Sequence, residues 1–248
     1  MDSLFIIKTG TTFPKTLQKW GDFGDWVRLG LQLAEDQVQV VDVVAGDPLP
    51  VAGNCRGVVV TGSHAMVTER PAWSVSVGNW LPSLIEAEVP LLGICFGHQL
   101  LADALGGRVG FHPGGREIGT VDIQLAPACQ TDPLFSELPT GFPAHVTHAQ
   151  TVLDLPPGAT RLAGNFFEPH HAFRAGTCAW GVQFHPEFHR GIMACYLREQ
   201  ATELAAAGRH VEPLLRAIRD TPTSHQLLRR FAALATNPST ENLGGRPC

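Results

Sequence analysis

Cysteine pairs, long apolar runs and clusters of basic residues are all missing from this sequence of 248 residues. The six cysteines are widely spaced and include no C-x-x-C pair, which argues against a disulfide framework and against a zinc cluster. No run approaches the roughly 18 apolar residues of a membrane span. The N-terminus also has no basic stretch followed by a long apolar one. We therefore expect a cytoplasmic protein without membrane association.

The charge pattern excludes another class of partner. The net charge is -5, and the 18 basic residues are scattered along the chain rather than clustered. This distribution lacks the electrostatic footprint of a nucleic-acid-binding protein, so we expect a small or weakly charged substrate. Hydrophobic residues make up 44% of the chain, which is enough for a large buried core.

Apolar periodicity predicts an α/β fold in the first part of the chain. Short apolar runs bounded by turn residues predict strands, and the segments between them predict helices. The expected strands span 4–7, 38–44, 57–61 and 89–94, and the expected helices span 16–34, 73–88 and 99–105. Gly21 and Gly24 weaken the first helix, Ser74 can cap the second, and Pro82 would kink it or end it early. Alternating strands and helices predict a parallel sheet covered on both faces.

The pattern changes twice farther along the chain. After residue 107, apolar residues alternate among glycines and prolines, which predicts shorter, partly antiparallel strands to about residue 184. Later stretches rich in Ala, Leu and Arg predict helices over 192–206, 211–218 and 226–235. We therefore divide the chain into a domain of residues 1–190 and a helical extension of residues 191–248. We expect the extension to pack on the same domain, with its last ~10 residues frayed.

The strongest chemical signal is Gly-Ile-Cys-Phe-Gly at 93–97, where a buried strand meets a helix. A nucleophile at such a junction occupies a sharp turn, and small residues two positions to either side allow the close backbone approach that the turn needs. A helix N-terminus also favours the thiolate form of a cysteine. A free cysteine is most often buried and has no chemical role, but the two glycines favour a nucleophile at Cys95.

A cysteine nucleophile needs a base, and the base needs an orienting group. His185 and Glu187 supply both, directly after the apolar segment 181–184. If that segment is a strand of the same sheet, Glu187 can hold one ring nitrogen of His185 while the other faces the sulfur of Cys95. A histidine and a glutamate two residues apart are more often surface residues, so this pair is informative only beside the Cys95 turn.

Two motifs together resemble the class I, triad-type glutamine amidotransferases: GICFGHQ at 93–99 and GVQFHPEF at 181–188. The likeness covers roughly residues 35–190. It implies the fold of that family, a flavodoxin-like, doubly wound, mostly parallel sheet with a small antiparallel subsheet, here followed by C-terminal helices. It implies neither a cofactor nor a metal. The sequence resembles in particular the stand-alone members that are described as GMP synthase-like.

The resemblance also implies roles for individual residues. Cys95 is expected to be the nucleophile, His185 the general base and acid, and Glu187 the orienting carboxylate. The positions matching the other family motifs are Gly62, Ser63 and Phe96 for the oxyanion hole, and Gln99, His148, Ala149 and Gln150 for substrate binding.

Two departures from the family pattern affect the expected substrate. Ser63 and His64 stand where the family turn has Gly and Pro, so the oxyanion loop is expected to differ in shape. Gln150 stands where relatives carry Asp, which changes how the α-amino group would be held. The expected substrate is therefore a γ-glutamyl group in general, as in γ-glutamyl peptidases, rather than free glutamine alone.

The expected reaction is hydrolysis of the γ-amide of glutamine or a γ-glutamyl compound through a thioester, which releases ammonia or an amine and then glutamate. The chain has no SGG-x-DS pyrophosphate-binding loop, so any synthetase is expected to be a separate partner. Two alternatives stay open: a homodimer formed by the C-terminal helices, and a non-catalytic or ammonia-donating role beside a separate synthetase. A metal hydrolase is disfavoured because H-P-E-F-H at 185–189 lacks the order of H-E-x-x-H.

Overall fold

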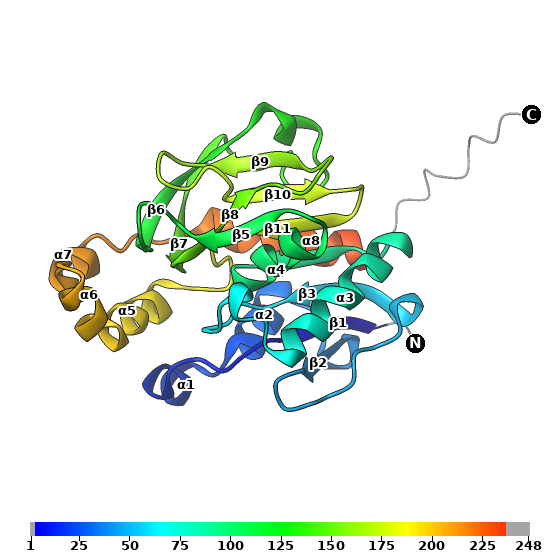
Figure 1. The fold of residues 1–248 in the computed structure, drawn as a ribbon, viewed down its shortest axis with the longest axis horizontal. Coiled ribbons are helices and arrows are strands. Elements are labelled where there is room, and N and C mark those ends of the chain that lie inside the picture. Colours follow the sequence, from blue (N-terminus) through cyan, green and yellow to red (C-terminus); the bar gives the residue numbers. More distant parts are fainter. Residues whose placement is uncertain (1–2, 237–248) are drawn as a thin grey trace, which may run out of the picture.

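The computed structural model describes residues 3–236, so the expected fraying of the last ~10 residues lies outside the described part. Its centre is one sheet of nine strands (Figure 1). They are β1 (Ser3–Lys8), β2 (Val38–Asp42), β3 (Cys55–Val60), β4 (Leu91–Ile94), β6 (Glu117–Leu125), β7 (Gly141–His148), β9 (Thr160–Gly164), β10 (Ala172–Ala175) and β11 (Ala179–Val182). The remaining strands, β5 (Arg108–Phe111) and β8 (Gln150–Asp154), form a separate antiparallel pair.

The sheet has a parallel half and an antiparallel half. Its strand order is β2-β1-β3-β4-β11-β10-β9-β6-β7. The first five strands pair in parallel, and the other four continue the same sheet in antiparallel fashion. The α/β fold with a mostly parallel core is therefore confirmed, although most of the antiparallel part extends the main sheet instead of forming a small one of its own.

Helices cover both faces of the parallel half. The helices of the described residues are α1 (Pro14–Trp20), α2 (Phe23–Leu31), α3 (Ala72–Glu86), α4 (Phe96–Ala104), α5 (Arg190–Glu199), α6 (Ala201–Ala206), α7 (Val211–Arg216) and α8 (Pro222–Thr236), of which α2 and α8 cover one face and α3 and α4 the other. Side chains alternate along each strand. Leu4 and Ile6 of β1 therefore share a core with α2 and α8, while Phe5 and Ile7 share the opposite core with α3 and α4. Within residues 3–236, no helix has the length and apolar character that crossing a membrane requires.

Local signals explain where the expected helices differ from the observed ones. The single helix expected over 16–34 is wrong, because Gly21 at φ +79° ends α1 and the Asp22 side chain caps a new helix, α2. Pro82 lies inside α3 without ending it. Ser74 is not the cap of α3, since the helix begins after Pro71 and Ser74 is buried within it.

The C-terminal helices form a third apolar cluster with the N-terminal ones. Met193 and Leu197 of α5 pack in the same cluster as Phe23 and Trp26 of α2. The helix expected over 192–206 is two helices, α5 and α6, which meet at Gln200. These helices border the carboxyl ends of the parallel strands. The proposed domain boundary at residue 190 stays a prediction.

Candidate active site

Cys95 occupies the turn between β4 and α4. Its backbone has φ +51° and ψ -97°, a region that residues with a side chain rarely adopt. Its N–H donates to the carbonyl of Val182 at 2.8 Å, which fixes the turn against β11. A Cβ atom at Gly97 would lie 2.5 Å from the carbonyl oxygen of Val60, and one at Gly93 would collide with the carbonyl of Gly97. Both positions therefore require glycine for the turn to close.

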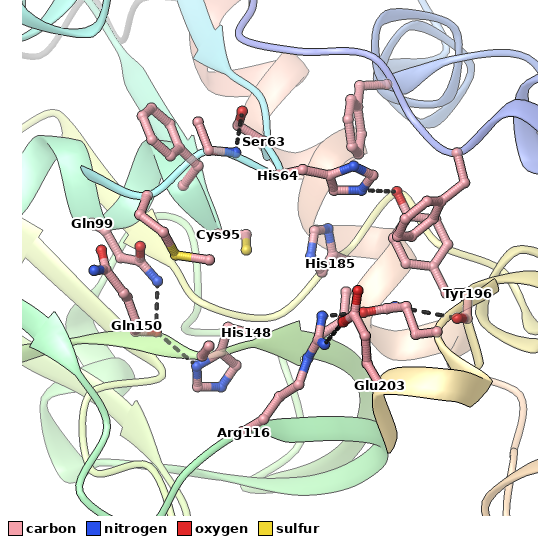
Figure 2. Close-up of a pocket in the computed structure, with 18 residues that line it drawn as sticks. Ser63, His64, Cys95, Gln99, Arg116, His148, Gln150, His185, Tyr196 and Glu203 are labelled. Carbon is pink, nitrogen blue, oxygen red and sulfur yellow. Dashed lines mark hydrogen bonds and ion pairs between the residues drawn. The ribbon is translucent and has the colours of Figure 1, made fainter. Parts of the chain in front are cut away.

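His185 and Glu187 lie beyond the end of β11, beside this turn. Nδ1 of His185 and Oε1 of Glu187 are 2.8 Å apart, and both side chains are buried. The His185 ring stacks on Phe188 with centroids 4.0 Å apart. A Cβ atom at Gly62 would contact both the His185 ring and Cβ of Cys95. Figure 2 shows the sulfur of Cys95 and the ring of His185 facing the same cavity.

The charges around His185 determine its protonation. Burial acts to lower its pKa, but the negative charges of Glu187 and Cys95 together outweigh burial and raise that pKa to about 10. The ring therefore carries a proton on both nitrogens near neutral pH. Nδ1 is held by Glu187, and Nε2 forms no well-aligned hydrogen bond within residues 3–236.

Two backbone N–H groups border the cavity next to Cys95. Phe96 is the first residue of α4, so its N–H has no acceptor within the helix. The Gly62 carbonyl lies 3.0 Å from the hydroxyls of both Thr9 and Thr61. Because the N–H of a trans peptide points away from its carbonyl, these threonines direct the N–H of Ser63 away from themselves. Ser63 and Phe96 both line the cavity.

The expected substrate-binding residues lie on the other side of Cys95. Nε2 of Gln99 donates to the carbonyl of Gln150 at 2.7 Å, and the same carbonyl accepts from Nδ1 of His148 at 2.9 Å. The Gln150 side chain donates to Thr68, whereas its Oε1 is buried and has no partner among the described residues. Ala149 lines the same wall. The structure thus brings all four residues to one side of the cavity.

Glu117 is a buried residue behind this wall that the sequence patterns did not single out. Its Oε2 lies 3.0 Å from Nε2 of His148 and 3.3 Å from Nε2 of His171. Burial acts to raise the pKa of the carboxyl, but hydrogen bonds from His148 and His171 prevail and hold that pKa well below its ordinary range. His148 thus lies between the Gln150 carbonyl at Nδ1 and this buried carboxylate at Nε2.

The cavity itself has a volume of about 390 Å³ and extends past His185 to side chains from segments far apart in the sequence. Beyond His185 it is lined by Phe13, His64, Tyr196, Arg116 and Glu203. His64 stands in the turn already noted as a departure from the family pattern, whereas no short motif marks the other four residues. His189, the other histidine of H-P-E-F-H, accepts from the N–H of Gly191 as the cap of α5.

The chain is similar to known proteins both in sequence and in fold. Residues 32–202 match the family model of class I glutamine amidotransferases. A glutamine-hydrolysing GMP synthase from Porphyromonas gingivalis is 35% identical over 136 residues, which are 54% of this chain and 25% of that protein. A glutamine-hydrolysing GMP synthase subunit from Haloarcula marismortui is 38% identical over 112 residues, 45% of this chain and 57% of that one. The chain thus matches about a quarter of the first relative's length.

The fold also has solved counterparts. The crystal structure of a glutamine amidotransferase from Thermotoga maritima superposes with a TM-score of 0.75 at 23% identity, covering 95% of this chain and 98% of that one. At this level of identity the likeness establishes a shared fold.

Proposed function

The chain belongs to the class I glutamine amidotransferase family, and from that premise we propose that it hydrolyses the γ-amide of glutamine or of a γ-glutamyl compound at Cys95. The observation that carries the proposal is the arrangement of Cys95, His185 and Glu187. A cysteine on a strained turn faces a histidine whose second nitrogen is held by a buried carboxylate, which is the general pattern of an activated nucleophile.

The proposed reaction has two halves. The thiolate of Cys95 attacks the γ-carbonyl carbon, and the resulting oxyanion accepts hydrogen bonds from the N–H groups of Ser63 and Phe96. His185 then gives its Nε2 proton to the departing nitrogen, which leaves as ammonia or an amine, and a thioester forms. In the second half His185 takes a proton from water, the hydroxide adds to the thioester carbon, and glutamate leaves as the sulfur regains its electron pair.

Glutamyl recognition is assigned to the wall of Gln99, His148, Ala149 and Gln150. The buried Oε1 of Gln150 lacks a partner among the described residues, and an unsatisfied buried acceptor favours a ligand that donates. The α-ammonium group of a glutamyl substrate is such a donor. A neutral amide at this position would bind that group without forming an ion pair.

A second candidate is ammonia supply to a separate synthetase. The Haloarcula marismortui relative is named as one subunit of GMP synthase, which supports a partner in trans for this chain as well. The chemistry at Cys95 would be unchanged, but the ammonia would pass to the partner. A synthetase partner predicts that glutamine is the preferred substrate and that hydrolysis is slow in isolation.

The homodimer stays a prediction, to be tested by sedimentation at micromolar concentration.

The test compares two cysteine variants. Cys95→Ala is expected to abolish glutamate release from glutamine and γ-glutamyl compounds, whereas Cys178→Ala, which changes a cysteine outside the cavity lining, retains it. The glutamine-mimicking electrophile 6-diazo-5-oxonorleucine should add to Cys95, as read by peptide mass spectrometry. Labelling confined to another cysteine, or full turnover by Cys95→Ala, would contradict the proposal.

A further inference from the structure

The part of the cavity beyond His185 has the character of a binding site for the leaving amine. We propose that it binds an amino acid with an apolar side chain, so that the preferred substrates are γ-glutamyl dipeptides with an apolar second residue. This inference rests on the proposed function and specifies its substrate class. We call the residues Phe13, His64, Tyr196, Arg116 and Glu203 the leaving-group wall.

The position of His185 separates the two ends of the substrate. In Figure 2, Gln99 and Gln150 lie on one side of the Cys95 sulfur, and His185 lies on the other, with His64 and Tyr196 beyond it. If the glutamyl part occupies the Gln99 side, the scissile nitrogen faces His185, which must reach that nitrogen to protonate it. Whatever is attached to the nitrogen then extends into the leaving-group wall.

Ammonia would make no use of this wall. The cavity volume of about 390 Å³ falls within the roughly 300–1,000 Å³ of pockets that bind drug-sized ligands. Glutamine fills the glutamyl side and leaves only ammonia on the other. The additional space therefore fits a larger leaving group.

Aromatic rings make one part of the wall apolar. The ring centroids of Phe13 and His64 are 4.2 Å apart, and those of Phe13 and Tyr196 are 5.1 Å apart. The Tyr196 hydroxyl is 2.8 Å from the hydroxyl of Thr12, so its polar end is already partnered. Burial is the main reason that the pKa of His64 is lowered, and the positive charges of His185 and Arg116 lower it further. The His64 ring is therefore neutral at pH 7. The wall therefore offers ring faces and edges to an apolar side chain.

Charges on the same side determine which end group is accepted. Arg116 donates to Oε2 of Glu203 at 3.0 Å and to Oε1 of Gln200, but its buried Nε has no partner among the described residues. Glu203 is the acidic residue in the lining and is 71% exposed. With Arg116 and the protonated His185 nearby, a cationic tail such as that of a polyamine is disfavoured. The carboxylate of an amino acid can instead pair with Arg116.

The experiment measures kcat/KM for glutamate release from a matched panel. The panel contains γ-glutamyl-leucine, γ-glutamyl-glycine, the isopentylamide that is the decarboxylated counterpart of the leucine dipeptide, the putrescine amide, and glutamine. We expect γ-glutamyl-leucine to exceed γ-glutamyl-glycine about tenfold, equivalent to ~1.4 kcal/mol. It should also exceed its isopentylamide, and the putrescine amide should be the poorest γ-glutamyl amide of the four.

Variants connect this preference to the wall. Phe13→Ala, or Phe13→Leu if the first does not fold, should reduce the leucine-to-glycine ratio to about threefold or less. Phe166→Ala, a change at a fully exposed phenylalanine outside the cavity lining, should leave the ratio as it is. Arg116→Gln should remove the advantage of the leucine dipeptide over its isopentylamide. An equal fall of kcat/KM for both compounds would show instead that Arg116 binds the glutamyl end.

The two levels of the proposal fail in different ways. If no compound yields glutamate with the wild-type protein, or if Cys95→Ala retains turnover, the proposed function itself is wrong. If glutamine is hydrolysed but the leucine dipeptide shows no advantage over the glycine dipeptide, only the leaving-group wall is wrong. The same conclusion follows if the putrescine amide is preferred, if the ratio survives in both Phe13 variants, or if Arg116→Gln lowers both leucine compounds equally.

Discussion

Replacing Gly97 by alanine tests how tightly the Cys95 turn is packed. The new Cβ atom would lie 2.5 Å from the carbonyl oxygen of Val60 and 3.0 Å from its carbonyl carbon. Both are backbone atoms of β3, in the middle of the sheet, so neither can move without moving the strand. Overpacking of this kind costs about 1–3 kcal/mol, and the higher helix propensity of alanine offsets up to ~1 kcal/mol of that cost.

We therefore expect Gly97→Ala to lower the free energy of unfolding by up to about 3 kcal/mol, which corresponds to a fall in Tm of up to roughly 12 °C for a chain of this size. The matched control is Gly78→Ala inside α3, where the added Cβ would only touch a side-chain atom of Leu100 at 3.4 Å. That variant should gain about 0.5–1 kcal/mol, so the two substitutions should shift Tm in opposite directions.

The activity assay for the same pair is the rate of inactivation by 6-diazo-5-oxonorleucine. Moving α4 away from β3 displaces both the Cys95 sulfur and the Phe96 N–H, so Gly97→Ala should react far more slowly than Gly78→Ala even at temperatures where both are folded. If Gly97→Ala matches the wild-type protein in both Tm and inactivation rate, the close approach of α4 to β3 does not constrain the nucleophile as we argue.

Three further predictions concern the groups around Cys95. Glu187→Gln removes a charge that raises the pKa of His185, so the alkaline limb of kcat/KM should move to lower pH, with less loss of turnover than in His185→Ala; an unmoved limb would count against the pair. Thr61→Val removes one hydroxyl from the Gly62 carbonyl and should lower kcat ~10-fold with little change in KM, and a change confined to KM would refute this positioning role. Glu117→Gln should destabilise the protein by roughly 1–3 kcal/mol in urea unfolding at pH 7, because it replaces the carboxylate that lies beside buried His148 and His171 with an amide. Since the pKa of Glu117 is lowered on folding, its contribution is present above the ordinary carboxyl value of 4.5 and is lost as pH falls below that value. If the free energies of unfolding of the variant and the wild type change with pH in parallel below 4.5, this role of Glu117 is refuted.

The sequence predicts those parts of the candidate site whose residues lie close together in the chain. Gly93, Cys95 and Gly97 are close in the chain, and so are His185 and Glu187, so strand ends were enough to bring them to one edge of the sheet. Glu117 is the first residue of β6 in the antiparallel half, Arg116 directly precedes that strand, and Tyr196 belongs to α5, which packs against residues of α2. Their approach to Cys95 depends on tertiary packing, which local patterns do not encode.

The same distinction explains the errors in the helices. Gly21 was recognised as a weak point, but only the capping of α2 by Asp22 made two helices more favourable than one. Pro82 does not end α3 early, and Val77, Leu81 and Leu84 of that helix are fully buried. The burial of these side chains compensates for the missing backbone hydrogen bond. In both helices, a contact that helix propensity does not describe determines where the helix begins or ends.

Segments near residue 13 and near residue 203 lie on one side of the cavity that holds Cys95. Cys95 directly follows β4, and His185 and Glu187 follow β11, whereas Phe13 precedes α1 and Glu203 lies in α6. In the proposed reaction, the residues that break the amide bond follow strands of the sheet, and the residues that contact the leaving group come from other segments. If the proposed function holds, a library of substitutions restricted to residues such as Phe13 and Glu203 would change which γ-glutamyl compound is preferred while Cys95, His185 and Glu187 stay as they are.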